Sequence, residues 1–249
     1  MPRVGTRKLY HILGAELPLG RDKLFDVLRA NNMLVRPRRQ YRTTTDSHHM
    51  FRKHKNIVAE LDITHPEQVW VSDITYLGSR GKHNYLSLVT DAYSKKIVGY
   101  DLSDSLAAEG AIRALKMALR GRQYDSELIH HSDRGVQYCC PAYQKVLNRK
   151  KVTVSMTESY DPYANAIAER VNGILKDEFM LESFNVELRE LSQIVRQSVD
   201  VYNNIRPHFS CQLLTPSRMH AQREIVKPKY TKRKSGVSSL TPDIKTNFI

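Results

Sequence analysis

Three acidic residues have the type and spacing for metal-dependent phosphodiester chemistry: Asp73, Asp133 and Glu169. Asp73 and Asp133 lie where short apolar runs end, in VWVSDITYL and IHHSDRGVQY, and Glu169 lies inside a helix-patterned stretch. Carboxylates from three elements can hold two divalent ions roughly 3.5–4 Å apart, which activate a nucleophile and stabilise the leaving oxygen of a phosphodiester. The interval 169 − 133 = 36 leaves thirty-five residues between the last two acids. All three are therefore candidate metal ligands.

Each aspartate, taken alone, also has an ordinary structural explanation. Asp73 follows an apolar run, and a buried carboxylate needs a cation, a set of hydrogen bonds or a metal. Asp133 precedes a glycine turn and could close an Asx-turn, in which the side chain accepts a hydrogen bond from the backbone two residues on. Residue type alone does not decide between these explanations and a metal site.

Glu169 belongs to a polar stripe of its expected helix. At about 100° per residue, the stripe is formed by Asn165, Glu169, Asn172 and Lys176. Lys176 follows Glu169 by two turns, or about 10.5 Å along the axis. This spacing suits a carboxylate on a metal and an ammonium group on DNA. The alternative is an ordinary solvated helix face.

The charge balance indicates a polyanionic partner. The chain has 249 residues, a formal net charge of +13 and a pI near 9.7, which is typical of nucleic-acid binding, although a protein can also be basic without such a partner. Basic residues cluster between positions 36 and 55, including Arg38, Arg39 and Arg42, and again between 227 and 234. Both segments could lie along phosphates, or could be a solvated linker and tail.

Several classes of protein are disfavoured by composition. The sequence has no apolar run of the roughly twenty residues that span a membrane, and no apolar signal segment at its start. Only three cysteines occur, two of them adjacent, which fits a reducing cytosol better than a disulfide framework. We expect a cytoplasmic protein.

The N-terminal region, residues 1–35, is predicted to hold two short helices. The first spans about 6–15, the break falls at Leu17-Pro18-Leu19-Gly20, and the second begins at about Arg21. Two helices around a Pro/Gly turn, with basic residues outside, resemble part of a helix-turn-helix. An ordinary helical hairpin is the alternative. We predict a basic linker at 36–66, a core at 67–224 and a basic flexible tail at 225–249.

The core has the pattern of an α/β domain. Three strands with short connections predict an antiparallel meander, and later strands alternate with helices, so we expect a mixed sheet covered by helices. The strands are expected at 69–77, 85–91, 97–102, 128–131 and 152–156. The helices are expected at 107–119, 142–148, 164–180 and 186–204.

Four short sequence motifs, taken together, resemble one family. VWVSDITYL, HHSDRGVQY, YANAIAERVNGILKDEF and YNNIRPHFS…LTPSRM are similar to the integrase-core component of bacterial insertion-sequence transposases that are made from two overlapping reading frames. This family belongs to the ribonuclease H-like, retroviral-integrase-like DDE superfamily. The resemblance extends from about Gly5 to about Arg223, and GTRKLYHIL…GRDKLFDVLRANNMLV is similar to the helix-turn-helix segment before the core.

The resemblance implies a ribonuclease H-like mixed five-stranded sheet flanked by helices, with a small helix-turn-helix-like segment in front. It places the catalytic and metal-binding acids on Asp73, Asp133 and Glu169. It also implies DNA contacts by Lys176 and Asn165, whereas Arg206 of the YNNIRP motif would pair with phosphate or brace the active site. Arg38, Arg39 and Arg42 of the linker are further expected DNA contacts.

The activity implied by the resemblance is DNA transposition with two Mg²⁺ ions, for which Mn²⁺ is a substitute. A metal-activated water would cut one strand at the end of the element, and the exposed 3′-hydroxyl would attack another phosphodiester. The implied partners are the element ends, target DNA, further copies of the chain on paired ends, and an upstream-frame protein with a helix-turn-helix and a coiled coil. The expected location is the nucleoid.

Two other functions fit the same residues. A DNA-binding regulator without catalysis would explain the charge but not the presence of all three acids. A structure-specific nuclease on the same fold would hydrolyse DNA without joining it.

Overall fold

The computed structural model describes residues 1–14, 16–35, 50–78, 83–158 and 165–222. Arg38, Arg39 and Arg42, expected as DNA contacts, lie outside these ranges, as does the tail predicted for residues 225–249. Among the described helices, none is long and apolar enough to cross a lipid bilayer.

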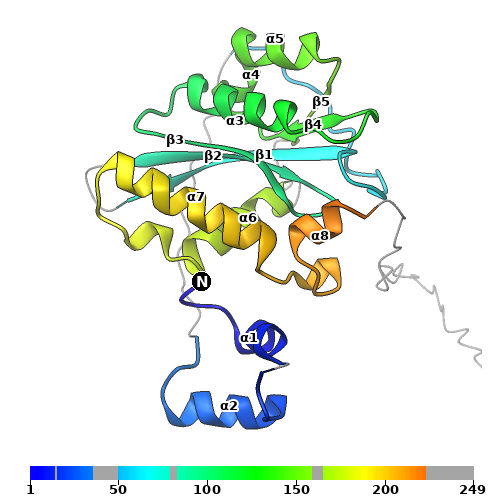
Figure 1. Cartoon of the computed structure of the whole chain (residues 1–249). Helices are drawn as coiled ribbons and strands as arrows, with labels where there is room; N and C mark the ends of the chain where they lie inside the picture. The colour runs from blue at the N-terminus through cyan, green and yellow to red at the C-terminus, as the bar shows by residue number, and fades with distance from the viewer. Residues whose placement is uncertain (15, 36–49, 79–82, 159–164, 223–249) are drawn as a thin grey trace, which may run out of the picture.

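A five-stranded sheet with strand order β3-β2-β1-β4-β5 forms the centre of the structure (Figure 1). Its first three strands form an antiparallel meander, β4 runs parallel to β1, and β5 runs parallel to β4, so the predicted mixed sheet is confirmed. The strands are β1 (Val69–Leu77), β2 (Asn84–Asp91), β3 (Ile97–Ser103), β4 (Ile129–Ser132) and β5 (Thr153–Met156). Strand β1 is central and largely buried, which agrees with its near-continuous apolar run.

Helices cover both faces of the sheet (Figure 1). One face carries α3 (Ala108–Arg120), α4 (Val136–Cys139) and α5 (Pro141–Arg149). The other carries α6 (Ala166–Asp177), α7 (Leu188–Asn204) and the short α8 (Pro216–His220). The helices α3, α5, α6 and α7 were predicted, with bounds that differ by a few residues, whereas the short α4 and α8 were not.

Each helical layer closes its own hydrophobic core. Trp70, Tyr143 and Leu115 are buried between the sheet and the layer of α3 to α5. Leu86 and Tyr202 are buried between the sheet and the layer of α6 and α7. Burial of large apolar side chains on both faces stabilises the sheet, because each contributes roughly 1.5–3 kcal/mol on leaving water.

Close packing of α3 on β3 depends on a glycine. A Cβ atom added at Gly99 would lie 2.2 Å from the carbonyl oxygen of Ala114 and 2.9 Å from the Cβ of Ala118. The backbone oxygen cannot move away without disturbing α3, so only glycine fits at this point of the strand.

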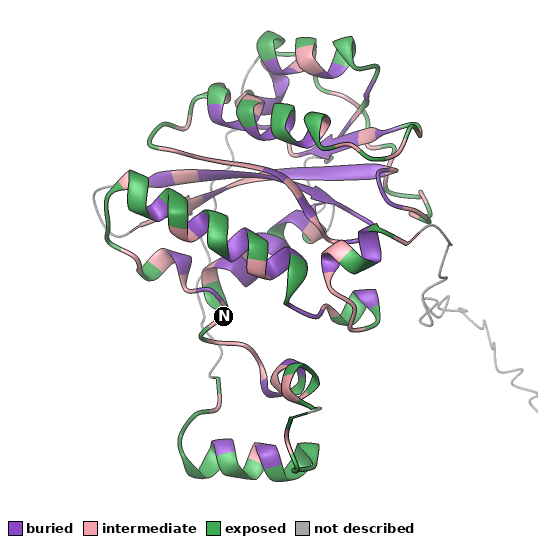
Figure 2. Cartoon of the chain, viewed as in Figure 1, coloured by how far each residue is buried: buried purple, intermediate pink, exposed green. Residues whose placement is uncertain are grey.

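The predicted N-terminal helices are present as α1 (Thr6–Leu13) and α2 (Arg21–Ala30), beyond α6 and α7 on the side away from the sheet (Figure 1). Most of their surface is exposed, although Leu24 and Leu28 are buried (Figure 2). The segment before α1 contacts the core: the Arg3 amide donates to the Glu178 carbonyl at 3.1 Å, and Met1 packs against the second core.

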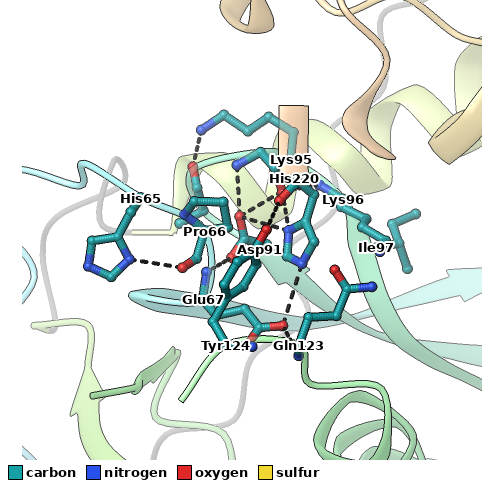
Figure 3. A network of polar contacts seen from close by, with 12 residues as sticks. His65, Pro66, Glu67, Asp91, Lys95, Lys96, Ile97, Gln123, Tyr124 and His220 are labelled. Atoms are coloured by element: carbon teal, nitrogen blue, oxygen red, sulfur yellow. Dashed lines mark hydrogen bonds and ion pairs between the residues drawn. The ribbon is translucent and has the colours of Figure 1, made fainter. Parts of the chain in front are cut away.

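A buried network of polar groups anchors α8 at the end of the sheet where β2 turns into β3 (Figure 3). His220 of α8 lies between two carboxylates, with Nε2 3.4 Å from Oε1 of Glu67 and Nδ1 3.7 Å from Oδ1 of Asp91. Its Nδ1 also lies 3.0 Å from the Ser94 hydroxyl, which donates to Asp91 at 2.7 Å. A protonated ring therefore donates to Ser94, and Ser94 donates to Asp91.

The network shifts the pKa of all three charged groups toward the ionised form. Burial alone would lower the pKa of His220, but its contacts with Asp91 and Glu67 outweigh that effect and raise it. Burial would raise the pKa of Asp91 and of Glu67, but contacts with His220 and hydrogen bonds from Ser94, Gln123 and Tyr124 lower both. The network is therefore an ion cluster, and it is nearly inaccessible to solvent.

We expect His220→Gln to lower the free energy of unfolding by about 3 kcal/mol at pH 6, because it removes the cation shared by two buried carboxylates and leaves Glu67 with Arg122 alone. A raised His220 pKa stabilises the fold fully below the ordinary value of 6.5, and that contribution is lost as pH rises through the folded pKa. Urea denaturation at pH 6 and pH 9 should therefore show a smaller difference between variant and wild type at pH 9.

The matched control is His11→Gln, which changes an exposed histidine of α1. The free energy of unfolding of His11→Gln should equal that of the wild type at pH 6 and at pH 9. An equal cost of His220→Gln at pH 6 and pH 9 would show that His220 acts as a neutral, packed ring.

Candidate active site

The pairing of β1 with β4 places two of the three acids side by side. The strands are parallel, and Ser72 pairs with Ser132, so Asp73 and Asp133 are the next residues along two neighbouring strands. Strand β4 ends at Ser132, whereas β1 continues past Asp73 to Leu77. The two carboxylates therefore approach one another at the carboxyl end of β4.

Asp133 also forms the Asx-turn that its sequence predicted as an alternative. Its Oδ1 accepts a hydrogen bond of 2.9 Å from the Gly135 amide. A Cβ at Gly135 would lie 2.9 Å from that same Oδ1, so a larger residue would push the carboxylate out of this position. The turn orients the carboxylate, and a carboxylate held in this way can still be a metal ligand.

Two amide side chains hold α6 against β1. The Asn172 Nδ2 donates to Oδ2 of Asp73 at 2.7 Å, and the Asn165 Nδ2 donates to the Ser72 carbonyl oxygen at 3.1 Å. Glu169 lies one turn from each of them on the same helix. The predicted polar stripe of α6 thus faces the edge of β1 that carries Asp73, with Asn165 and Asn172 buried and Glu169 exposed.

The charge of Asp73 is poorly compensated within the protein. Burial raises its pKa to about 7, and repulsion from Asp133 and, more weakly, Glu169 adds to the shift. Its hydrogen bonds from Asn172 and from the Ile74 amide only partly oppose this. Burial also raises the pKa of Glu169. Within the described residues no lysine or arginine pairs with Asp73, so an added cation would relieve the repulsion.

The donor set fits magnesium. Mg²⁺ prefers oxygen ligands and is usually bound by one or two carboxylates together with water and substrate phosphates. In the described part of the chain, no three His, Cys, Asp or Glu side chains already converge as a complete metal cluster. The three acids are thus electrostatic neighbours, and their convergence on one point is a proposal.

Two residues expected to contact DNA are internal instead. Asn165 is buried, and its amide donates to the backbone of β1. Arg206 is 1% exposed and forms two hydrogen bonds of 2.8 Å with Glu178. Neither side chain can reach a phosphate without breaking these contacts. Of the two roles considered for Arg206, the structure supports bracing.

Lys176, the third expected DNA contact of the core, is partly exposed and forms an ion pair. Its ammonium group lies 2.9 Å from Oε1 of Glu182, in the short 3-10 helix η1 (Leu181–Ser183) that follows α6. The pair is partly exposed, and such pairs contribute little to stability, so Lys176 can exchange Glu182 for a phosphate at small cost. Its contact with DNA remains a prediction.

Glu178 connects the catalytic layer to the N-terminal helices and was not singled out from the sequence. It accepts hydrogen bonds from Arg206 and, at 2.6 Å, from Lys8 of α1. Burial would raise the pKa of Glu178, but the two cations outweigh it and lower the pKa. Burial lowers the pKa of Lys8 despite this partner. The apolar spacing of α6 gave no signal for a contact with a residue 170 positions earlier.

We predict that Asp73→Asn stabilises the protein when no divalent cation is present, by about 1–3 kcal/mol at pH 8, because it removes a half-buried, repelled charge. The folded protein keeps a proton on Asp73 up to about pH 7, whereas the unfolded chain releases it near 3.8. Unfolding therefore releases a proton, and wild-type stability falls relative to the variant between those values. Urea denaturation at pH 4, 6 and 8 in a chelator measures the difference.

The exposed Asp104 provides the control, since Asp104→Asn should leave stability close to wild type at every pH. A constant difference between Asp73→Asn and wild type from pH 4 to pH 8 would contradict the assigned repulsion.

For Arg206→Met we expect a loss of about 3 kcal/mol in unfolding free energy, because the largely covered Glu178 then keeps only Lys8. Exposed Arg189→Met, on α7, should cost little. Thermal and urea denaturation compare them. Unchanged stability of Arg206→Met together with weakened DNA binding would return Arg206 to the role of a phosphate contact.

Comparison with protein families supports the assignment of the core. A family model described as "Integrase core domain" matches residues 63–162, and a second model with the same description matches residues 150–216. Together these ranges contain every strand described above, and they include Asp73, Asp133 and Glu169.

Relatives by sequence are proteins of insertion elements. The chain is 32% identical over 216 residues to the IS600 31 kDa protein of Shigella sonnei, which covers 86% of this chain and 79% of that protein. It is 33% identical over 155 residues to the IS629 transposase of Shigella sonnei, and 34% over 158 residues to the transposase InsF of IS3fB from Escherichia coli. The chain spans about half the length of these two transposases, 51% and 55%.

Solved structures show the same fold. The catalytic core domain of HTLV-2 integrase, determined in complex with magnesium, aligns with a TM-score of 0.50 at 17% identity and covers 63% of this chain and 97% of that one. The intasome of simian T-cell lymphotropic virus, in complex with the regulatory subunit B56 gamma, aligns with a TM-score of 0.57 at 15% identity over 92% of this chain and 79% of that one. The sheet and its helices therefore have the ribonuclease H-like fold of retroviral integrases.

Proposed function

Because the chain belongs to the integrase-core family of insertion-sequence transposases, we propose that it is a metal-dependent DDE transposase that cuts DNA at insertion-sequence ends and joins the cut end to another strand. The observation that carries this proposal is the placement of Asp73 and Asp133 directly after a paired serine on two neighbouring parallel strands. Glu169 lies on the helix that is hydrogen-bonded to the first of them.

Asp73, Asp133 and Glu169 are the proposed ligands of two magnesium ions. When bound, magnesium would polarise the phosphoryl group and offset charge on the attacking and leaving oxygens. The raised pKa of Asp73 and the absence of a lysine or arginine partner among the described residues support this role, because both make cation binding favourable. Asn172 orients the Asp73 carboxylate, and the Asx-turn orients that of Asp133.

The proposed reaction has two displacements at phosphorus. In the first, water attacks the scissile phosphodiester, and the bond to the 3′-oxygen of the element breaks as that oxygen gains a proton. In the second, the new 3′-hydroxyl loses its proton, attacks a phosphodiester of the target strand and displaces another 3′-oxygen. The number of phosphodiester bonds is conserved in the second step, and no bond to the protein forms.

The proposed assembly follows from the reaction. Two element ends must be held together with a target, so we propose that several copies of the chain act on paired DNA ends in the nucleoid. An upstream-frame protein with its own helix-turn-helix and coiled coil is a proposed partner. Lys176, on the last turn of α6, is proposed to contact the DNA close to the cleavage point.

Asp133→Asn tests the proposed chemistry. We expect cleavage and joining to fall by at least about a thousandfold, because the neutral side chain no longer binds a cation, while affinity for DNA stays within a few-fold of wild type. The assay uses a labelled DNA fragment carrying the end of the host element, with Mg²⁺ or Mn²⁺, and resolves cut and joined strands on a denaturing gel.

Asp104→Asn, at an exposed position, should retain both products. Cut strands without joined strands, with and without the upstream-frame partner, would identify a nuclease instead. DNA binding without any product in either condition would identify a regulator.

A further inference from the structure

A pocket of about 350 Å³ lies between α6, α1, the β2–β3 turn and the segment that follows α7. Arg206, His208, Phe209 and Ser210 come from that last segment, which includes the 3-10 helix η2 (Phe209–Cys211). Lys8 comes from α1 and Lys95 from the turn, and α6 contributes Ala166, Ile167, Arg170 and Val171. None of these residues takes part in the chemistry assigned above. Its size is near the lower end of the range of about 300–1,000 Å³ for ligand pockets.

The pocket combines an apolar lining with basic groups. Lys8, Lys95, Arg170 and Arg206 line it, and of these Lys8 and Arg206 share the single carboxylate of Glu178. Arg170 is exposed and forms no ion pair within the described residues. Burial, with added repulsion from these cations, lowers the pKa of His208 to about 3, so its ring is neutral. Lys95 contributes less, because burial lowers its pKa and its amine donates to the Ala92 carbonyl oxygen. Lys8, Arg170 and Arg206 against the one carboxylate of Glu178 still leave an excess of positive charge, which favours an anionic ligand.

An aromatic ring lies at the same place. Phe209 is 56% exposed, although a large apolar side chain usually finds cover. The Lys8 ammonium group lies 5.8 Å from the centre of its ring. A partly exposed ring beside lysine and arginine groups is the combination that binds unpaired nucleotides, with the base on the ring and the phosphate on the cations.

The pocket lies close to the acidic residues, because α6 carries both Glu169 and part of the pocket lining. Ala166 and Arg170 are four positions apart and share one face of the helix, and Glu169 lies about 100° around the axis from Arg170. A DNA strand held at Glu169 would therefore pass close to Arg170. A pocket of this volume has room for one nucleotide and not for a base pair.

We propose that this pocket binds a single unpaired nucleotide of the DNA strand near the cleavage point, with its phosphate on Arg170 and its base against Phe209. The inference rests on the proposed function, since it requires DNA at the acidic residues. Lys8 belongs to the wall of the pocket, so docking of α1 on the core completes the site. Occupancy of the pocket would thereby favour the docked arrangement of the N-terminal helices.

The first test compares two labelled duplexes of the same sequence, one blunt and one with a two-nucleotide unpaired end. Fluorescence anisotropy should show that the wild-type chain binds the second roughly tenfold more tightly, because stacking of a base contributes on the order of 1–3 kcal/mol. Phe209→Leu should remove that preference. Arg170→Gln should weaken binding of the duplex with the unpaired end and lower its slope of log affinity against log salt by about 0.7, the value for one phosphate contact of an unpaired strand.

The matched control is Arg149→Gln, which removes an exposed charge from α5 on the opposite face of the sheet. Arg149→Gln should keep the preference for the unpaired end and the wild-type slope of log affinity against log salt. Thermal denaturation should show each variant folded, since Arg170 and Phe209 are both well exposed. An unchanged preference in Phe209→Leu together with an unchanged slope in Arg170→Gln would overturn the proposal.

The second test does not depend on cleavage. Phe209→Trp adds an indole to a chain whose one natural tryptophan, Trp70, is fully buried and gives a constant background. Thymidine 3′,5′-bisphosphate should quench the new fluorescence, and Arg170→Gln in the same background should weaken that response about tenfold. Absence of quenching, or a response to hexaglutamate in place of the nucleotide, would overturn the proposal.

The two proposals can fail separately. A chain that cuts and joins DNA but shows no effect of Phe209→Leu, Arg170→Gln or the nucleotide keeps its proposed function and loses this pocket. A chain that quenches with the nucleotide but forms no cut strand keeps the nucleotide site and loses the transposase activity.

Discussion

The parallel pairing of β1 with β4 is the constraint on which the candidate active site depends. It places Asp73 and Asp133 at equivalent positions on neighbouring strands, so two like charges must approach one another where β4 ends. Burial and this repulsion together raise the pKa of Asp73 to about 7. The surrounding elements hold the arrangement in place: α6 is hydrogen-bonded to β1 through Asn165 and Asn172, and both helical layers bury the sheet.

Other carboxylates that are buried or largely covered in the described structure differ from Asp73, because they have protein cations as partners. Glu67 and Asp91 share His220, and Glu178 shares Lys8 and Arg206. In each case protein cations hold the carboxylates in their ionised form, as expected where a charge leaves water. Asp73 has hydrogen bonds but no such cation within the described residues, although Arg134 follows the neighbouring acid in sequence. This contrast separates acids that stabilise the fold from one that is suited to bind a metal, and it does so without reference to relatives.

The cations around Glu178 also connect parts of the chain with different proposed roles. Lys8 belongs to the N-terminal helices, Glu178 follows the helix that carries Glu169, and Arg206 follows α7. One ion cluster thus joins the expected DNA-binding segment to the layer that carries the third acid. The cationic pocket lies on that junction, where DNA at the acidic residues would meet the N-terminal helices.

The sequence by itself determined the order of elements and the three acids. Apolar runs and helical spacing located five strands, four core helices and two N-terminal helices within a few residues, because burial of one or two faces imposes a local period. The short helices α4 and α8 were missed, since four or five residues are too few to show a period. The resemblance of four short sequence motifs to insertion-sequence transposases predicted the family, the fold and the acids together.

Only the tertiary structure decided what the polar residues do. Asn165 and Arg206 were expected at DNA, but both are buried and bonded to groups far away in sequence, Ser72 and Glu178. Asn172 was one member of a polar stripe until the packing of α6 on β1 paired it with Asp73. The contacts of a polar side chain depend on which distant segment lies opposite, and the local period of a sequence carries no information about that partner.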